Sequence, residues 1–341
     1  MIVTVTFHCA DNYGAVWQAF ALQSYIKSAF PKQDVACLDY KPKYLQAKLF
    51  HFDNNESLIK SLAKNVLTLP SRLERILRFR KFRKKNINTV PFESLGTIDA
   101  FDTLFIVGSD QVWNKKITNN RLDPIFFLEN IQKGMKCSYA ASVGNDDGDS
   151  IVEIANRLTN FSYIGIREFK VVQELKKNGF SNVLWNVDPV FLLDKNDYLM
   201  LLPKVNSDKY ILIYTLETNE AIRGIVKNYG KEYRTISIGS FKNIYSADRH
   251  YSCASPEMFL SLIANASLVV SNSFHTLAFS IIFDKDFLYV PLKNGRGSRI
   301  ENLLRILNVD GNMCRNTSSK KTELMKQIIS SKQYLSDIIT L

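Results

Sequence analysis

The sequence is poor in the residues that build disulfides and metal sites. Its 341 residues include only five cysteines and four histidines. The cysteines are odd in number, lie far apart and form no CxxC pair, and the histidines form no HxxxH pattern. This usage argues against a disulfide framework and a zinc site and favours a reducing compartment. We therefore expect no bound metal ion and a cytoplasmic location.

Long apolar runs are also missing. No stretch of about 18 apolar residues occurs, so the sequence predicts no membrane-spanning helix. Residues 1–7 have neither the charged start nor the long apolar core of a signal peptide. Any contact with a membrane is therefore expected at the surface of the protein, at the inner face of the membrane.

Two further absences bear on the ligand. No GxGxxG segment is present, which argues against the usual dinucleotide-binding turn. No recognised RNA- or DNA-binding signature occurs, so nucleic acid is not expected as a partner. The net charge of +11 nevertheless favours an anionic partner, and charge alone does not separate nucleic acid, acidic lipid and a phosphorylated substrate.

The length and the composition predict a globular α/β protein of two domains. Hydrophobic residues make up 46% of the chain, which is ordinary for a protein with a packed core. Short apolar segments alternate with amphipathic ones, a pattern typical of a parallel sheet covered by helices. The pattern restarts after residue 195, so we expect domains at 1–195 and 196–341. The expected strands lie at residues 2–7, 35–40, 102–108, 137–143, 163–166, 183–187, 210–214, 235–239, 268–270 and 287–291.

Three helical segments are expected in the first quarter of the chain. In residues 15–26, apolar side chains recur on one helical face. Residues 57–69 predict a second helix that Pro70 ends. Residues 72–85 carry eight basic residues and one acid, and predict a basic, partly amphipathic helix. That helix is either a solvated charged surface or a contact for anionic lipid or a phosphate-bearing carrier.

Polar loops follow several of these strands, where open α/β sheets bind their ligands. The segment Asn12-Tyr13-Gly14 precedes a helix, so its glycine and the helix start favour an anion or a hydroxyl. The segment Ser109-Asp110-Gln111 offers groups suited to sugar hydroxyls, and its carboxylate could act as a base. Each segment is equally compatible with an ordinary capped turn.

Two later loops and one further segment carry cationic groups. Arg167 follows a strand, and its guanidinium suits bidentate contact with a carboxylate or phosphate. Ser271-Asn272-Ser273-Phe274-His275 joins a strand to an apolar helix and predicts an anion cradle. His275 can donate a hydrogen bond to phosphate or act as a proton donor near neutral pH. Arg296 and Arg299 lie among glycines and suit an anion-gripping loop. The alternatives are a capping histidine, an arginine paired with its neighbours and a flexible basic turn.

These loops occur in a recognisable order. They comprise Asn12-Tyr13-Gly14-Ala15 with Gln18-Ala19, Val107 to Asn114, Gly165-Ile166-Arg167-Glu168, Val187-Asp188-Pro189-Val190, Ser271 to His275 and Arg296 to Arg299. In this order and spacing, over roughly residues 5–310, the sequence resembles the polysaccharide pyruvyl transferase family.

The resemblance implies two Rossmann-like domains facing a cleft, in a GT-B-like arrangement. The acceptor side would lie in residues 1–195, with the basic helix 72–85, and the donor side in residues 196–341. It further implies phosphoenolpyruvate as co-substrate, with no cofactor. The acceptor would be a sugar hydroxyl pair on a lipid-linked oligosaccharide for exopolysaccharide or capsule. The products would be a pyruvate ketal and phosphate.

The resemblance also assigns roles to individual residues. It implies that Arg167 and His275 bind the donor, and the anion cradle adds Asn272 and Ser273 to the expected donor contacts. Many family members carry an arginine two residues before the histidine, where this chain has Ser273. Arg296 and Arg299 are therefore expected to supply the missing cation. His275 would act as an acid or as a phosphate clamp, and Asp110 would be the catalytic group on the acceptor side. Acceptor binding is expected from Asn12, Tyr13, Gly14, Ser109, Asp110 and Gln111.

Two other functions fit the same sequence. A nucleotide-sugar glycosyltransferase of GT-B architecture would use the same anion cradle for a diphosphate. A non-enzymatic glycan-binding protein would rely on the basic helix at residues 72–85. The first alternative predicts binding of sugar nucleotides, and the second predicts no turnover.

Overall fold

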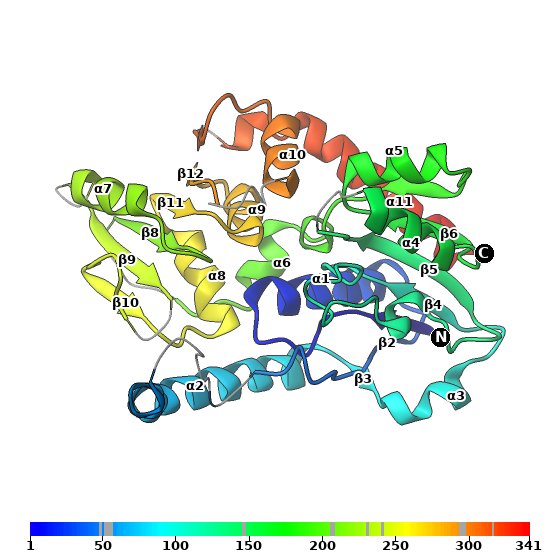
Figure 1. Cartoon of the computed structure of the whole chain (residues 1–341). Helices are drawn as coiled ribbons and strands as arrows, with labels where there is room; N and C mark the ends of the chain where they lie inside the picture. The colour runs from blue at the N-terminus through cyan, green and yellow to red at the C-terminus, as the bar shows by residue number, and fades with distance from the viewer. Residues whose placement is uncertain are drawn as a thin grey trace.

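The computed structural model describes residues 1–47, 50, 57–144, 148–204, 209–229, 232–239, 242–292, 298–315 and 317–341. The chain forms two open β-sheets in succession (Figure 1). Their strand orders are β3-β2-β1-β4-β5-β6-β7 and β10-β9-β8-β11-β12-β13. In each sheet the chain starts at the centre, moves to one edge and then returns to build the other. This is the Rossmann-like order, and it confirms the expected α/β class with two Rossmann-like units.

The predicted strands are confirmed, with small differences in their ends. All paired neighbours run parallel except β12 and β13. The edge strands β3, β10 and β13 were not predicted, because two or three residues are too few to show a pattern. The strands are β1 (Ile2–Val5), β2 (Val35–Leu38), β3 (Thr89–Val90), β4 (Leu104–Val107), β5 (Met135–Ala141), β6 (Tyr163–Ile166), β7 (Val183–Trp185), β8 (Tyr210–Tyr214), β9 (Arg234–Ile238), β10 (Arg249–Tyr251), β11 (Leu268–Ser271), β12 (Asp286–Tyr289) and β13 (Met313–Cys314).

Helices cover both faces of each sheet, so central strands such as β1 and β4 are buried along their whole length. A short 3-10 helix, η3 (Pro189–Phe191), follows β7. The α-helices are α1 (Tyr13–Ala29), α2 (Leu58–Asn86), α3 (Leu95–Ile98), α4 (Gly148–Arg157), α5 (Phe169–Lys177), α6 (Lys195–Leu199), α7 (Glu220–Tyr229), α8 (Pro256–Asn265), α9 (Phe274–Ile282), α10 (Ser298–Ile306) and α11 (Thr322–Ile339).

The last helix, α11, returns to the first sheet. Its buried Tyr334, Leu335 and Ile338 belong to one apolar cluster with Ile2 and Leu104 of the first sheet. The Tyr334 hydroxyl donates a hydrogen bond of 2.7 Å to a carbonyl oxygen of β5. Figure 1 accordingly shows both chain ends on the same side of the molecule. The segment 196–341, expected as the second domain, thus ends in a helix that covers the first sheet.

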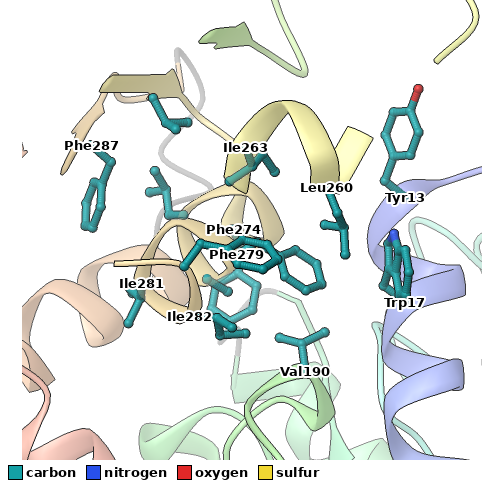
Figure 2. Close-up of a cluster of buried hydrophobic side chains, with 14 of the residues drawn as sticks. Tyr13, Trp17, Val190, Leu260, Ile263, Phe274, Phe279, Ile281, Ile282 and Phe287 are labelled. Atoms are coloured by element: carbon teal, nitrogen blue, oxygen red, sulfur yellow. The ribbon is translucent and has the colours of Figure 1, made fainter. Parts of the chain in front are cut away.

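Helix α1 is the main link between the two halves. The predicted apolar face is buried, but so are Val16 and Trp17, because side chains of α8 and α9 pack against the remaining side. Figure 2 shows Tyr13 and Trp17 of α1 beside side chains of α8 and α9 in one apolar cluster. The Trp17 indole donates a hydrogen bond of 3.2 Å to the Pro256 carbonyl at the start of α8. The two halves therefore share a continuous core.

Helix α2 corrects one prediction, since Pro70 does not end it. Leu58–Asn86 is a single helix with Pro70 inside. Proline removes one backbone hydrogen bond, here that of the Val66 carbonyl, and an interior proline costs about 3 kcal/mol. Val66 and Pro70 lie on the exposed side of the helix, where water can bind the released carbonyl. The opposite side packs Phe79 and Phe82 into the shared core, which compensates for the loss.

The two sides of α2 are expected to respond very differently to truncation. Phe82 is fully buried, with its ring 4.7 Å from that of Trp17, so Phe82→Ala should lower the free energy of unfolding by about 3–5 kcal/mol. Leu77 is 61% exposed on the same helix, and Leu77→Ala should change it by less than about 0.5 kcal/mol. Urea unfolding of both variants tests this, and equal losses would contradict the packing described.

Candidate active site

Loops from both sheets meet at Arg167, which directly follows β6. The side chain is buried, and its Nη2 forms an ion pair of 2.8 Å with Oδ2 of Asp188, which follows β7. The same Nη2 donates a hydrogen bond to the hydroxyl of Ser109, which follows β4. Because parallel strands end at one edge of the sheet, these separate segments converge there.

His275 brings the second half of the chain to this cluster. It lies in the first turn of α9, and its Nε2 is 3.4 Å from Oδ2 of Asp188. Its ring also lies against Gly14 in the first turn of α1, where an added Cβ would lie closer than 3.0 Å to three ring atoms. Real Cβ atoms do not approach so closely. Gly14 is therefore required by the position of the imidazole, rather than by a turn of the backbone.

Asp188 is the electrostatic centre of the cluster. Its side chain is fully buried, and burial alone would raise its pKa. The charges of Arg167 and His275 outweigh burial and hold the pKa of Asp188 below its ordinary value. Its other carboxylate oxygen accepts a hydrogen bond of 3.1 Å from the Val190 backbone at the start of η3. A fixed carboxylate thus orients the arginine and the histidine together.

Arg167 and Asp188 line a small cavity of about 30 Å³. This is room for roughly one or two water molecules, or for one anionic group of a larger ligand. Buried polar atoms in its wall have no hydrogen-bond partner among the described residues: Nε and Nη1 of Arg167 and the whole amide of Asn186. Buried polar groups are nearly always paired, so these atoms indicate a polar ligand or ordered water. His275 does not line this cavity and joins the cluster through Asp188.

Arg299 supplies a second cation to the same cavity. Its guanidinium lies 5.6 Å from the ring centre of Phe274, as does that of Arg167. Burial and the nearby charge of Arg167 lower the pKa of Arg299, while Glu168 and Asp110 act in the opposite direction. The two arginines share the cavity wall with a single carboxylate, that of Asp188, which pairs with Arg167. This arrangement is consistent with an anion site.

Several predicted site residues lie elsewhere or have structural roles. Asn12 is exposed and caps α1 by accepting a hydrogen bond of 3.2 Å from the Ala15 backbone. Tyr13 is buried, its ring stacks on Phe259 at 4.0 Å, and its hydroxyl donates to the Ala254 carbonyl at 2.8 Å. Asn12 therefore caps its own helix, and Tyr13 links α1 to the second half of the chain.

The amide side chains of Gln111 and Asn272, both predicted to bind ligands, make hydrogen bonds within the protein. The Gln111 amide oxygen accepts a hydrogen bond of 2.6 Å from Asn114. The Asn272 amide oxygen accepts one of 2.7 Å from the Leu216 backbone, which ties the loop after β8 to the loop after β11. Ser273 is buried at the start of α9 without making a capping hydrogen bond.

The remaining predicted residues are Asp110 and Arg296. Asp110 has a φ of 74° and accepts a hydrogen bond of 2.8 Å from the next backbone amide. Asp110 is not among the residues that line the cavity of Arg167 and Arg299. Arg296 lies outside the described residues.

The sequence did not assign a role to Asp188 or Asn186. Asp188 stands in a motif that carried the resemblance, but an acid before proline also reads as an ordinary cap. The available signal was its position directly after a strand, at the edge where Arg167 was expected. The contact of Asn186 is visible only in the structure, where a Cβ added at Gly165 would lie closer than 3.0 Å to the Asn186 amide oxygen.

A titratable pair beside the site allows a prediction on acid stability. Nε2 of His8, after β1, lies 3.0 Å from Oδ1 of Asp39, after β2. This hydrogen bond lowers the pKa of Asp39 to about 2. A lowered pKa means that the stabilisation is complete above the ordinary value of about 3.9 and is lost as the pH falls toward 2. We expect the urea midpoint to fall between about pH 4 and pH 2, and less steeply in Asp39→Asn. Identical slopes would contradict the pairing.

The fold and the cluster define an α/β protein whose strand-end loops bring arginine, aspartate and histidine together at the junction of its two halves. The model of the family "Polysaccharide pyruvyl transferase" matches residues 12–294, most of the chain. The chain therefore belongs to the polysaccharide pyruvyl transferase family and is a transferase, and the family resemblance of its motifs is confirmed. Comparison with curated proteins finds no match.

Among solved structures the likeness is low in sequence and extends over whole chains. UDP-GlcNAc 2-epimerase from Neisseria meningitidis bound to UDP-GlcNAc is 10% identical, with a TM-score of 0.46, covering 100% of this chain and 93% of that one. An S. aureus MnaA–UDP co-structure is 11% identical, with a TM-score of 0.49 and coverages of 97% and 88%. E. coli ADP-heptose LPS heptosyltransferase II is 10% identical, with a TM-score of 0.39 and coverages of 97% and 99%.

The residues that the structure describes give two findings, one on metal ions and one on membranes. They contain no group of three or more histidine, cysteine, aspartate or glutamate side chains placed to hold a metal ion. No described helix is both long enough and apolar enough to cross a membrane.

Proposed function

We propose that the chain transfers the pyruvate group of phosphoenolpyruvate to two hydroxyls of a sugar in a bacterial polysaccharide precursor. The products would be a pyruvate ketal and inorganic phosphate. The observation that carries this proposal is the pair Arg167 and Arg299 at one cavity, with Nε and Nη1 of Arg167 unbonded among the described residues. A donor with a carboxylate and a phosphate needs more than one such cation.

The proposed chemistry moves two protons and forms two bonds. The donor methylene carbon takes a proton, and one sugar hydroxyl oxygen bonds to the neighbouring carbon. The second hydroxyl oxygen then bonds to the same carbon, and the bond between that carbon and the phosphate oxygen breaks. Of the two protons that the hydroxyls release, one makes up for the proton taken by the methylene carbon, and the other leaves with the phosphate. No oxidation occurs, so the step needs no redox partner.

The cluster offers groups for this sequence. Arg167 and Arg299 would clamp one donor anion in the cavity, which has room for a single anionic group. His275, held by Asp188, would face the rest of the donor as acid or as phosphate clamp. Asp110, in the loop after β4, is our candidate base for the acceptor hydroxyl. The donor would then be held from both halves of the chain, by Arg167 from residues 1–195 and by Arg299 and His275 from residues 196–341.

The direct experiment follows the methyl group of the product. Incubation with phosphoenolpyruvate and a galactoside or lipid-linked acceptor should release phosphate and produce the methyl signal of a pyruvate ketal in the NMR spectrum. His275→Ala should lose both signals. Calorimetry with sugar nucleotides is the matched comparison: strong binding of a sugar nucleotide, with no ketal from any acceptor, would favour a glycosyltransferase and overturn the proposal.

We also propose that the protein works at the inner face of a membrane, which it contacts through α2. The sequence pointed to residues 72–85, but the structure shows an apolar stripe beginning earlier. Five apolar residues are exposed at spacings that place them on one side of the helix: Ile59 (83%), Leu62 (59%), Val66 (65%), Leu73 (41%) and Leu77 (61%).

Basic residues continue this stripe toward the end of α2. Arg80, Lys81, Lys84 and Lys85 are exposed. An apolar stripe bordered by lysine and arginine is typical of helices that lie in the interface of an anionic bilayer. Figure 1 shows α2 along one margin of the molecule, where a flat surface can approach it.

Vesicle sedimentation tests this surface. The protein should bind phosphatidylglycerol vesicles and not phosphatidylcholine vesicles, and Leu62→Ser with Leu77→Ser should weaken binding at least about tenfold, since each buried apolar side chain contributes about 1.5–3 kcal/mol. Ile329→Ser, at a 64% exposed position on α11, is the matched control and should bind normally. Equal binding by all variants, or a dimer that dissociates in the double variant, would overturn the membrane assignment.

A further inference from the structure

A second and larger cavity lies between α2 and the second sheet. Its volume is about 450 Å³, within the usual range of small-molecule sites. Side chains of α2 form one wall, and the segments that follow β8 and β9 form the other. The cavity thus opens at the carboxyl ends of strands, where open α/β sheets bind ligands. We call it the α2 groove.

The α2 groove is cationic. Lys64, Arg72 and Arg75 line it from α2, and Lys242 lines it from the second half. None of the described residues in its wall is acidic. Four positive charges around one concave surface favour an anion, because each repels the others when the groove holds only water.

The two arginines are held in place, whereas the two lysines are exposed. Arg75 donates a hydrogen bond of 2.8 Å to the Asp11 carbonyl, and its guanidinium lies 4.7 Å from the ring centre of Phe79. Arg72 donates one of 3.0 Å to the Asn65 side chain. Lys64 and Lys242 are exposed and add two ammonium groups to the wall of the groove. Two guanidinium groups held by hydrogen bonds, together with two ammonium groups, suit a phosphate or a diphosphate.

The wall of the groove also has apolar and polar surfaces that a sugar ligand could use. Tyr214, Leu216 and Ile238 supply apolar surface, and Thr68 and Ser71 supply hydroxyls. A smaller cavity of about 190 Å³ shares Leu216 and Lys242 with the groove. Glu217 and His250 line that smaller cavity, which can therefore bind neutral hydroxyl groups.

Two short paths connect the α2 groove to the Arg167 cluster. Leu216, in the groove wall, donates its backbone N–H to Asn272, three residues before His275. Arg75 lies 5.0 Å from the ring centre of Tyr13, whose neighbour Gly14 contacts the His275 ring. The α2 groove and the Arg167 cluster are therefore neighbours at the junction of the two halves.

We propose that the α2 groove binds the phosphate or diphosphate group through which the acceptor sugar is attached to its carrier. This inference rests on the proposed function and locates the acceptor's anionic end. It also gives α2 two roles on opposite sides, with cations facing the groove and apolar residues facing outward. A carrier at the membrane surface would meet both sides of one helix.

The test measures binding of inorganic pyrophosphate, uridine diphosphate and a short-chain prenyl diphosphate by calorimetry with the full chain. Lys64→Gln with Lys242→Gln should weaken the binding of whichever probes bind at least tenfold, and phosphoenolpyruvate should bind as before. Both lysines are exposed, so the variant should fold. The double variant Lys81→Gln with Lys84→Gln is the control. It also removes two positive charges, but from a part of α2 that does not line the groove, and it should bind all probes normally.

The outcomes separate the groove from the donor site. Weakened pyrophosphate binding with intact phosphoenolpyruvate binding supports the groove, and the tighter of the prenyl and uridine probes identifies the carrier. Equal diphosphate binding in wild type and both variants overturns the inference. If phosphoenolpyruvate fails to bind even the wild type, the proposed function fails, while the diphosphate result still decides the groove.

Discussion

Arg167→Gln is expected to lower kcat/KM for phosphoenolpyruvate by about 1000-fold, because a lost buried contact to an anion costs about 3–5 kcal/mol. The variant leaves the Asp188 carboxylate buried without its arginine. Breaking a buried ion pair in this way costs about 3–5 kcal/mol of stability. Lost activity therefore has to be separated from lost folding, and thermal unfolding must accompany the kinetics.

The double variant Arg167→Gln with Asp188→Asn makes that separation. Neutralising both partners removes the unpaired charge, so most of the stability should return while donor binding stays lost. Arg157→Gln is the control, because its ion pair of 2.6 Å with Glu129 is partly exposed. That variant should keep full activity and lose less than about 1 kcal/mol. Recovery of donor affinity in the double variant would show that Arg167 serves only to pair Asp188.

Gly14→Ala is expected to reduce activity at least about 100-fold, because small displacements of a catalytic group have effects of this size. The new Cβ would overlap the His275 ring. The ring cannot easily move away, since its Nε2 faces Asp188 at 3.4 Å. The substitution would otherwise favour α1 by about 1 kcal/mol, so helix propensity alone predicts a gain.

Gly224→Ala is the matched control for this prediction. Gly224 also lies inside a helix, α7, and an added Cβ there meets nothing within 4 Å. Its variant should be fully active and more stable by roughly 0.5–1 kcal/mol. Steady-state kinetics of both variants test the expected activities, and urea unfolding tests the expected stabilities. Normal activity in Gly14→Ala would mean that the His275 position tolerates displacement.

The sequence predicted the two sheets well, because their central strands are short apolar runs separated by helical periodicity. It also predicted Arg167, Ser109, Gly14 and His275 as neighbours of the site, since strand-end position is readable from the order of elements. It was wrong about Pro70, which lies inside α2. A local rule ended the helix there, and the buried side of the same helix overrides that rule.

Contacts that depend on a distant partner could not be predicted. Tyr13 and Asn272 carry groups suited to ligands, and the structure adds that both are bonded to segments more than 50 residues away. Their predicted roles in ligand binding stay predictions. Asp188 has no distinctive local pattern, yet it holds Arg167 and His275 together.

The sequence by itself determined the α/β class, the parallel sheets and the strand-end loops, because these depend on local hydrophobic period and on chain order. Only the tertiary structure decided which charges face one another. It placed Asp188 between Arg167 and His275. It also turned Lys64, Arg72 and Arg75 of α2 toward the second sheet and left an apolar stripe of the same helix exposed. The reason is that charge pairing and burial depend on distances between segments that are remote in the chain.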